Sequence, residues 1–417
     1  MNQRVDILYH VAAVRDADRV AARPGALALQ GGRVVAAGHP SDPRLSRLRA
    51  RQTVELPQRL LLPALVNAHA HLVLTSLGPR PFTSKFTEWL GQVIREAPRD
   101  RQAIIDSVGR GIDLSVRAGV GYLGDIAGAD ELASRARLRA EPMPGVSYLE
   151  CFGHETPRAI QAMEGAVKML QGEWAASNRD EVHWGITPHA PYSAGMRLYD
   201  AAARFSQISG CRLTTHLAET VEELQFVRDG VGPCADLLHD LGKWDASIKP
   251  TGLHPVDWVA PLLKNAHWLL AHCNYVEDSH IALLAKSRAS VVYCPLASEY
   301  FGHVAHRYRD MLEAGVNVCL GTDSILCQPP ENTQPLGIWP QMRRLFRRDG
   351  TDADTLLRMA TINGMRGLEL ARIDATFGSG SRSWLASVRI DPNDVTDPLT
   401  QALENDYPLE PVPNEET

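Results

Sequence analysis

The chain has 417 residues, of which 44% are hydrophobic and 22% are charged, and its formal net charge is −6. This composition is ordinary for a folded globular protein and excludes disorder, collagen-like repeats and a coiled coil. No basic block favours nucleic-acid binding, and the longest apolar run, 60–66, is far shorter than the ~20 residues that span a bilayer. The seven cysteines form no CxxC pair and the charged N-terminus does not resemble a secretory signal, so we expect a cytoplasmic enzyme with reduced thiols.

The first sixty residues predict short β strands. Residues 26–29 and 33–37 are apolar runs on either side of Gly31 and Gly32. Two such runs around a glycine turn are typical of a β-hairpin.

From Leu61 onward, short apolar runs alternate with longer stretches of helical period, which indicates a parallel sheet. The predicted strands are 61–69, 120–125, 146–152, 182–189, 212–216, 267–272, 290–294 and 317–323. The predicted helices are 101–118, 159–174, 196–209, 221–228, 279–286 and 308–314. Eight such units favour an α/β fold of the (β/α)8 barrel type. A doubly wound open sheet is the alternative, but no GxGxxG follows the first strand.

The alternation stops after about Leu370. Residues 378–381 predict a flexible turn, 384–390 a strand, and the proline-containing acidic end an extended tail. We therefore expect residues 1–60 as the β-rich N-terminal part of a small composite domain, 61–369 as the barrel, and 370–417 as a C-terminal β segment and tail.

Polar residues follow five of the predicted strands at their C-terminal ends, where a barrel of this type builds its active site. These residues are His69, His71, His189, His216, Glu219, His272, Asp323 and Ser324. Because His69 and His71 are two apart on a strand, both imidazoles point to one face. Imidazoles with a carboxylate suit Zn²⁺ or Fe²⁺. Any one of these histidines could be a packed or rim residue, but their joint placement favours a metal site.

The motifs around these residues resemble the amidohydrolase superfamily. His69-Ala-His71 follows an apolar strand, His216-Leu-Ala-Glu219 ends strand five, His272 ends strand six, and Gly321-Thr-Asp-Ser324 ends strand eight. With the segments 62–71, 86–90 and 187–192, the set resembles the mononuclear deaminase and chlorohydrolase branch. That branch contains cytosine and guanine deaminases, adenosylhomocysteine-type nucleoside deaminases and triazine hydrolases. The resemblance extends to about Leu370.

The resemblance implies a role for each of these residues. One divalent metal ion per chain, Zn²⁺ or alternatively Fe²⁺, would be bound by His69, His71, His216 and Asp323. Glu219 would shuttle protons, His272 would hold a metal-bound hydroxide in line, and Asp323 would also accept a proton. His189 would hydrogen-bond the substrate. For Glu219 the alternative is a solvated carboxylate at a helix start.

Further residues are candidate substrate contacts. Trp89 and Phe86, three apart, suit one buried helix face that also walls the pocket. Ser324 follows the expected metal ligand Asp323. His303 and His306 are extra histidines after strand seven, and a surface position at a helix start suits them equally.

Three features of the sequence bear on the metal and the substrate. Binuclear members of the superfamily use a lysine at the end of strand four, and 182–189 contains none, which favours one metal. After strand seven the branch usually reads Cys-Pro-x-Ser-Asn, whereas this chain reads Cys294-Pro-Leu-Ala-Ser298. Nucleoside deaminases of this type place a ribose-binding acid shortly after the Trp-Leu pair. Pro98 falls near that position here and Glu96 is close by, so free nucleosides are not expected to be the best substrates.

We therefore expect a hydrolase of C–N bonds other than peptide bonds. It would deaminate an aminated heterocycle of purine, pyrimidine, pterin or triazine type. The alternatives are displacement of chloride, opening of a cyclic amide, a binuclear amidase-like enzyme, and a catalytically silent scaffold relative. The expected partners are a small heterocyclic substrate and a second copy of the chain in a homodimer, with no nucleic acid and no membrane.

Overall fold

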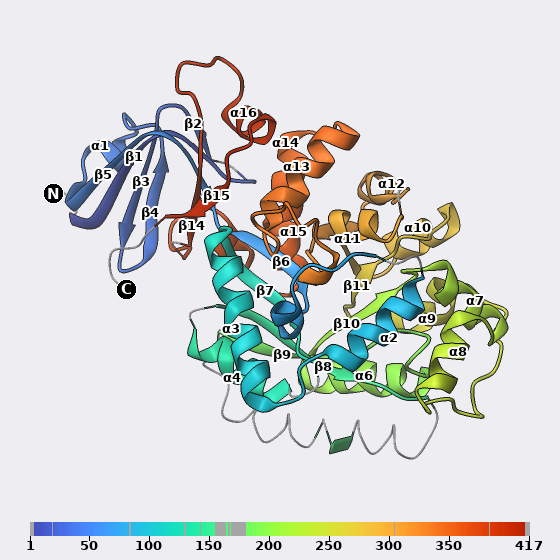
Figure 1. Cartoon of the computed structure of the whole chain (residues 1–417). Coiled ribbons are helices and arrows are strands. Elements are labelled where there is room, and N and C mark those ends of the chain that lie inside the picture. Colours follow the sequence, from blue (N-terminus) through green and yellow to red (C-terminus); the bar gives the residue numbers. More distant parts are fainter. Residues whose placement is uncertain are drawn as a thin grey trace.

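The computed structural model describes residues 4–18, 20–82, 85–128, 131–141, 143–154, 164–165, 167, 181–303, 305–382 and 384–412. Figure 1 shows two parts, a sheet built from both ends of the chain (blue and red) and a barrel of parallel strands with helices around it.

The terminal sheet combines N-terminal and C-terminal strands. They are β1 (Arg4–Arg15), β2 (Ala21–Ala22), β3 (Gly25–Gln30), β4 (Arg33–Gly38), β5 (Arg49–Pro63), β14 (Leu385–Arg389) and β15 (Leu409–Pro411). Their order is β15-β14-β5-β1-β3-β4, with β2 paired to β1. Strands β3 and β4 form the predicted hairpin, and its turn residues Gly31 and Gly32 have the positive φ that glycine tolerates.

The barrel strands are β6 (Leu65–Ala70), β7 (Val120–Ile126), β8 (Gly145–Cys151), β9 (Val182–Pro188), β10 (Arg212–Leu217), β11 (Leu269–His272), β12 (Ser290–Tyr293) and β13 (Asn317–Leu320). Each strand pairs in parallel with the next along the chain. The last strand returns to the first, because the carbonyl of His69 accepts hydrogen bonds from the N–H groups of Thr322 (3.1 Å) and Asp323 (3.0 Å). The predicted (β/α)8 barrel with a small terminal β domain is confirmed.

The helices are α1 (Pro43–Ser46), α2 (Phe86–Glu96), α3 (Arg101–Arg117), α4 (Glu131–Ala140), α6 (Met196–Ser209), α7 (Val221–Asp229), α8 (Pro233–Asp240), α9 (Pro255–Leu263), α10 (Asp278–Ala285), α11 (Pro295–Tyr300), α12 (Tyr308–Glu313), α13 (Ile338–Asp349), α14 (Ala353–Ala360), α15 (Ile362–Gly367) and α16 (Pro398–Glu404). Short 3₁₀ turns are η1 (Leu72–Leu77), η2 (Ile325–Cys327) and η3 (Arg372–Ala375). Five predicted helices occur as α3, α6, α7, α10 and α12, with ends that differ by at most one residue. The sixth, 159–174, lies almost wholly outside the described residues.

The first predicted strand, 61–69, is divided in the structure. Residues up to Pro63 belong to β5 and pair with β14, whereas β6 begins at Leu65. At the junction the N–H of Ala64 donates to the carbonyl of Trp384 (2.8 Å). Both strands are buried along this stretch, so one continuous apolar run crosses from one sheet to the other and conceals the break.

The C-terminal segment packs against the molecule in the region expected to be an extended tail. Asp397 caps α16 by accepting hydrogen bonds from the N–H groups of Leu399 and Thr400, and Leu399 and Leu403 are fully buried. Strand β15 then pairs with β14. No helix in the described part of the chain is long and apolar enough to cross a membrane.

Candidate active site

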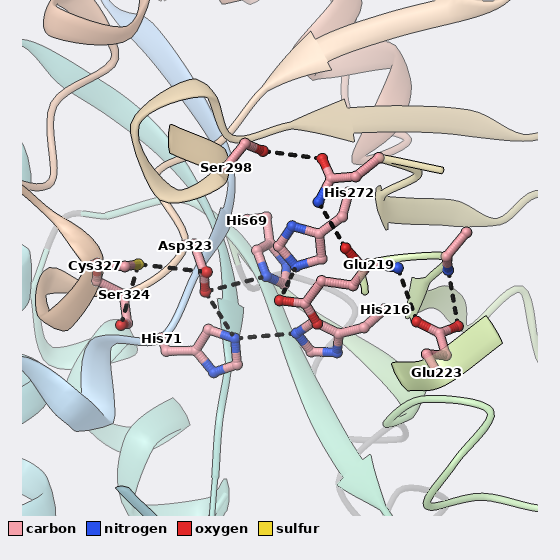
Figure 2. A network of polar contacts seen from close by, with 12 residues as sticks. His69, His71, His216, Glu219, Glu223, His272, Ser298, Asp323, Ser324 and Cys327 are labelled. Atoms are coloured by element: carbon pink, nitrogen blue, oxygen red, sulfur yellow. Dashed lines mark hydrogen bonds and ion pairs between the residues drawn. The ribbon is translucent and has the colours of Figure 1, made fainter. Parts of the chain in front are cut away.

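Side chains from four barrel strands meet at the C-terminal rim of the barrel, as Figure 2 shows. They are His69 in β6 and His71 after it, His216 in β10 and Glu219 after it, His272 at the end of β11, and Asp323 after β13. Within the group of three histidines, His69, His71 and His216, one nitrogen from each lies within 4.8 Å of the others. The same distance limit holds for Glu219, His272 and Asp323.

The three histidines present nitrogens to a common space. The Nε2 atoms of His71 and His216 are 3.3 Å apart, and the ring of His69 stands edge-on to both. The Nδ1 atom of His216 lies 2.9 Å from the carbonyl oxygen of His189. Because a carbonyl only accepts, this Nδ1 carries the proton, and the Nε2 lone pair faces the cluster.

Asp323 completes the cluster with one of its two carboxylate oxygens. Its Oδ1 lies 3.5 Å from Nε2 of His71 and 3.9 Å from Nε2 of His69. Its Oδ2 faces the thiol of Cys327 at 3.5 Å. The Cys327 thiol thus holds Oδ2, while Oδ1 points to the histidines.

Burial determines the protonation of these groups in the metal-free protein. It lowers the pKa of His71 to about 3 and that of His216 to about 4, and it lowers the pKa of His69 well below its usual value. It raises the pKa of Asp323 to about 7. The imidazoles are therefore neutral, which is the form that binds a cation, and a bound cation would favour the ionised carboxylate of Asp323.

The donor set fits a divalent cation. Both ring nitrogens of His69, at 1% exposure, and Nε2 of His272 are buried and have no hydrogen-bond partner among the described residues. Unpaired buried polar atoms are costly, and three imidazoles with one carboxylate form a ligand set suited to Zn²⁺. Residues 182–188 of β9 contain no lysine that could bridge a second ion.

Glu219 and His272 form a pair beside the cluster. Glu219 Oε1 lies 3.7 Å from His272 Nε2, and both residues are buried. Burial, and secondarily the nearby Asp323, raises the pKa of Glu219 well above its usual value. A carboxyl group with a raised pKa holds a proton more readily than an exposed one, which suits it to donate a proton as well as to accept one.

The backbone is strained at the strand ends that present these residues. Ala218, His272, Cys273 and Asp323 have φ values of 48°, 74°, 53° and 59°, in the left-handed region. This conformation costs a non-glycine residue roughly 1–3 kcal/mol and clusters at functional sites.

His189 follows β9, and its ring centroid is 4.9 Å from that of His216. Its Nδ1 is 2.6 Å from the hydroxyl of Ser193, and its Nε2 is 3.9 Å from Oε1 of Glu150 in β8. Burial raises the pKa of Glu150 to about 8. Sequence reasoning missed Glu150, although an acid near the end of an otherwise apolar barrel strand was an available signal.

The other candidate substrate contacts lie in distinct settings. Trp89 in α2 is buried among aromatic rings, with centroids 6.2 Å from Phe86 and 4.9 Å from Phe301. The hydroxyl of Ser324 faces the Cys327 sulfur, and His303 Nδ1 lies 2.8 Å from the Tyr275 hydroxyl. Among the described residues, none of the three hydrogen-bonds to the histidine cluster.

Comparisons with known proteins agree with this architecture. The model of the amidohydrolase family matches residues 60–374. The chain is 28% identical over 350 residues to the aminodeoxyfutalosine deaminase of Deinococcus radiodurans, covering 82% of this chain and 81% of that protein. It is 26% identical over 377 residues to the 5-methylthioadenosine/S-adenosylhomocysteine deaminase of Moorella thermoacetica, covering 85% and 80%. The structure of an adenosine deaminase from Xanthomonas campestris with bound zinc has the same fold, with a TM-score of 0.76, 21% identity, and coverage of 97% of this chain and 90% of that one.

Proposed function

The chain belongs to the amidohydrolase family of metal-dependent hydrolases, and on that premise we propose that it deaminates the adenine ring of a nucleoside or a closely related aminated heterocycle. The observation that carries the proposal is the meeting of a histidine–aspartate cluster with the Glu219–His272 pair at one barrel rim. The names of the two similar deaminases, which cover most of the chain, support the substrate class.

His69, His71, His216 and Asp323 would hold one divalent cation, with Zn²⁺ favoured over Fe²⁺. The neutral imidazoles support this ligand set, and the zinc in the X. campestris deaminase supports the choice of metal. When bound, the cation supplies a Lewis acid that lowers the pKa of a water molecule to about 7.

The side chains around the cluster would manage the protons. Hydrolysis of an amidine-like carbon places the water oxygen on carbon, one water proton on the ring nitrogen and the other on the departing amine, which leaves as ammonia. Glu219 would accept the first proton and carry it to the ring nitrogen, because its carboxyl is buried beside the cluster and has a raised pKa. His272 Nε2, for which the described residues offer no hydrogen-bond partner, would hold the attacking oxygen in line. Asp323 would accept the second proton, which then passes with the help of Glu219 to the departing amine.

His189 would bind the substrate next to the reacting carbon. Its ring lies between the cluster and Glu150, and Ser193 fixes one of its nitrogens. The other ring nitrogen faces Oε1 of Glu150 at 3.9 Å, so the two groups could contact a ligand seated beside them.

Free bases are the second candidate class, and one observation favours them. Glu96 is close to the position where nucleoside deaminases hold ribose, but it pairs with Arg80 at 2.7 Å and with Gln92 at 2.9 Å, while Asp100 caps α3. A ribose would therefore need another acceptor in this chain. The names of the relatives favour nucleosides as substrates, whereas the pairing of Glu96 favours free bases. The substrate panel must therefore contain both classes.

The test is ammonia release by the zinc-loaded protein from adenosine, 5′-deoxyadenosine, 5′-methylthioadenosine, adenine, guanine, cytosine, pterins and aminotriazines. We expect the highest kcat/KM for an adenine nucleoside, and no release from the chelator-treated protein. A higher kcat/KM for a free base would move the proposal to the second class. Absence of ammonia from every compound, with zinc bound, would contradict deamination.

A further inference from the structure

We propose that Glu223, Asn274 and Ser298 are positioning residues that hold the main chain of Glu219 from both sides (Figure 2). This inference rests on the proposed role of Glu219 as the proton shuttle. It concerns how the shuttle is held, and none of these three side chains has a role in the scheme above.

Glu223 holds the shuttle from the side of helix α7. Its Oε1 accepts a hydrogen bond from the N–H of Ala218 and its Oε2 accepts one from the N–H of Glu219, both at 2.8 Å. Glu223 is fully buried, and its own N–H donates to the hydroxyl of Thr220, the N-cap of α7 (3.2 Å). The first turn of α7 therefore fixes the carboxylate of Glu223, which in turn holds the main chain of Glu219.

The main-chain N–H groups of Ala218 and Glu219 need a hydrogen-bond acceptor. The chain leaves β10 after Leu217, and Ala218 adopts a φ of 48°. The two N–H groups that follow are therefore turned out of the sheet while they remain buried. Without Glu223 they would lack this acceptor in the protein interior, and an unpaired buried N–H is unfavourable.

Asn274 and Ser298 hold the other side. The Nδ2 of Asn274 donates to the main-chain carbonyl of Glu219 (3.0 Å), and the hydroxyl of Ser298 donates to Oδ1 of Asn274 (3.0 Å). Both residues are buried. Because the hydroxyl occupies Oδ1, the amide keeps its NH₂ toward Glu219.

The hydrogen bond between Ser298 and Asn274 gives a function to segment 294–298, where the sequence differs from the motif of the related branch. Ser298 stands where the related branch usually has asparagine, and here it orients an asparagine supplied by the loop after β11. Both main-chain polar atoms of Glu219 are thereby held by buried side chains, while its carboxyl remains free beside His272.

Such bracing matters because proton transfer requires hydrogen-bond geometry. A misplacement of 1 Å caused by a residue outside the chemistry can lower the rate by about 10²-fold. The contacts are with the main chain of Glu219 and not with the metal or the substrate. We therefore expect substitutions of the three residues to change kcat.

The test uses isosteric variants of the zinc-loaded full-length chain. Glu223→Gln replaces one acceptor by a donor that faces an N–H, and Asn274→Asp replaces the donor that faces the Glu219 carbonyl. Glu222→Gln, in the same helical turn but partly exposed, is the matched control. The measurements are kcat and KM on the best substrate of the panel, zinc content, thermal midpoint, and hydrogen exchange of the Glu219 amide.

We expect kcat to fall about 10-fold to 100-fold in both variants, with KM and zinc content near wild type. Exchange of the Glu219 amide should be faster in Glu223→Gln, and Glu222→Gln should match the wild type in every measurement. Ser298→Ala should also lower kcat. Ser298→Thr keeps the hydroxyl and should have a kcat near that of the wild type.

Two outcomes would overturn the inference, and they differ from a failure of the proposed function. If Glu219→Gln is inactive but Glu223→Gln and Asn274→Asp keep kcat within twofold, the bracing is not needed for catalysis. If both variants lose zinc and thermal stability while kcat per bound zinc is unchanged, the network is only structural. If Glu219→Gln itself keeps its activity, the proposed function is wrong.

Discussion

Glu219 is the residue on which the proposed chemistry depends most directly. Replacing it with glutamine keeps the size and shape of the side chain but removes its capacity to carry a proton. We expect Glu219→Gln to lower kcat by at least ~10²–10⁴, a loss of at least about 2.7 kcal/mol of transition-state stabilisation. Zinc content and thermal midpoint should stay near wild type, because the residue is not a proposed ligand.

His216→Ala is the contrasting variant, since His216 is a proposed ligand. It should lose zinc and activity together, as measured by elemental analysis and ammonia release. A Glu219→Gln protein that keeps a tenth or more of wild-type kcat would show that this carboxyl does not carry the protons.

Glu150 gives a prediction about pH. Its folded pKa is about 8, above the usual value of 4.5, so between these values the folded state holds a proton that the unfolded state releases. The stability contributed by this proton is present below pH 4.5 and is lost as pH rises toward 8. Glu150→Gln cannot ionise and should escape this loss.

The measurement is urea unfolding of the chelator-treated wild type and Glu150→Gln at several pH values. The variant should gain stability relative to wild type as pH rises from 5 to 8, and the difference should level off above that. A difference that does not change with pH would show that the carboxyl is not held neutral in the folded protein.

The metal-site candidates could be predicted from the sequence, whereas the buried glutamates that support the site were not predicted. His69, His216 and Asp323 follow or end apolar strands, and the carboxyl ends of parallel strands meet at one rim. Glu150 and Glu223 act through contacts with residues on other strands or turns. The position of Glu150 near the end of an apolar strand was an available signal, whereas no local pattern distinguishes Glu223 from a solvated residue of a helix.

At the scale of elements, strands were easier to predict than helices. The barrel strands are apolar runs flanked by polar residues, so all eight were located, although the predicted 61–69 begins four residues before β6 and the predicted 317–323 ends three residues after β13. Helices such as α9, which begins at Pro255 and contains Pro261, and α11, with six residues, are too short or too proline-rich to show a clear helical period. The break between β5 and β6 was missed because apolar residues continue across it.

The close approach of β7 to β6 supplies a prediction at this scale. A Cβ added to Gly124 in β7 would lie 2.4 Å from the main-chain carbonyl oxygen of Ala68 and 2.8 Å from Leu368, so β6 would have to shift next to His69. We expect Gly124→Ala to lower the free energy of unfolding by about 1–3 kcal/mol and to weaken zinc binding.

Gly165→Ala is the comparison variant without a clash, because a Cβ at that position meets no atom of the described residues within 4 Å. Since Gly165 lies in a helix, we expect the alanine to leave stability unchanged or to raise it by up to about 1 kcal/mol. Urea unfolding and zinc titration of the two variants provide the comparison. Equal stability and equal zinc affinity of Gly124→Ala and wild type would contradict the close packing of these two strands.

At the scale of the whole molecule, the barrel brings together residues from its first strand and from the loop after its last strand. His69 lies near the start of the barrel and Asp323 follows its last strand, and backbone hydrogen bonds between them close it. A cation held between these two residues would join the first and last strands, so metal binding should stabilise the folded chain as a whole.

Zinc titration of the chelator-treated protein tests the central claim most directly, with ammonia release and thermal midpoint followed on the same samples. The account predicts an inactive starting protein, and a rise of both quantities that ends at one zinc per chain. Activity in the metal-free protein, or a rise that continues to two zinc ions per chain, would contradict a single catalytic cation held by His69, His71, His216 and Asp323.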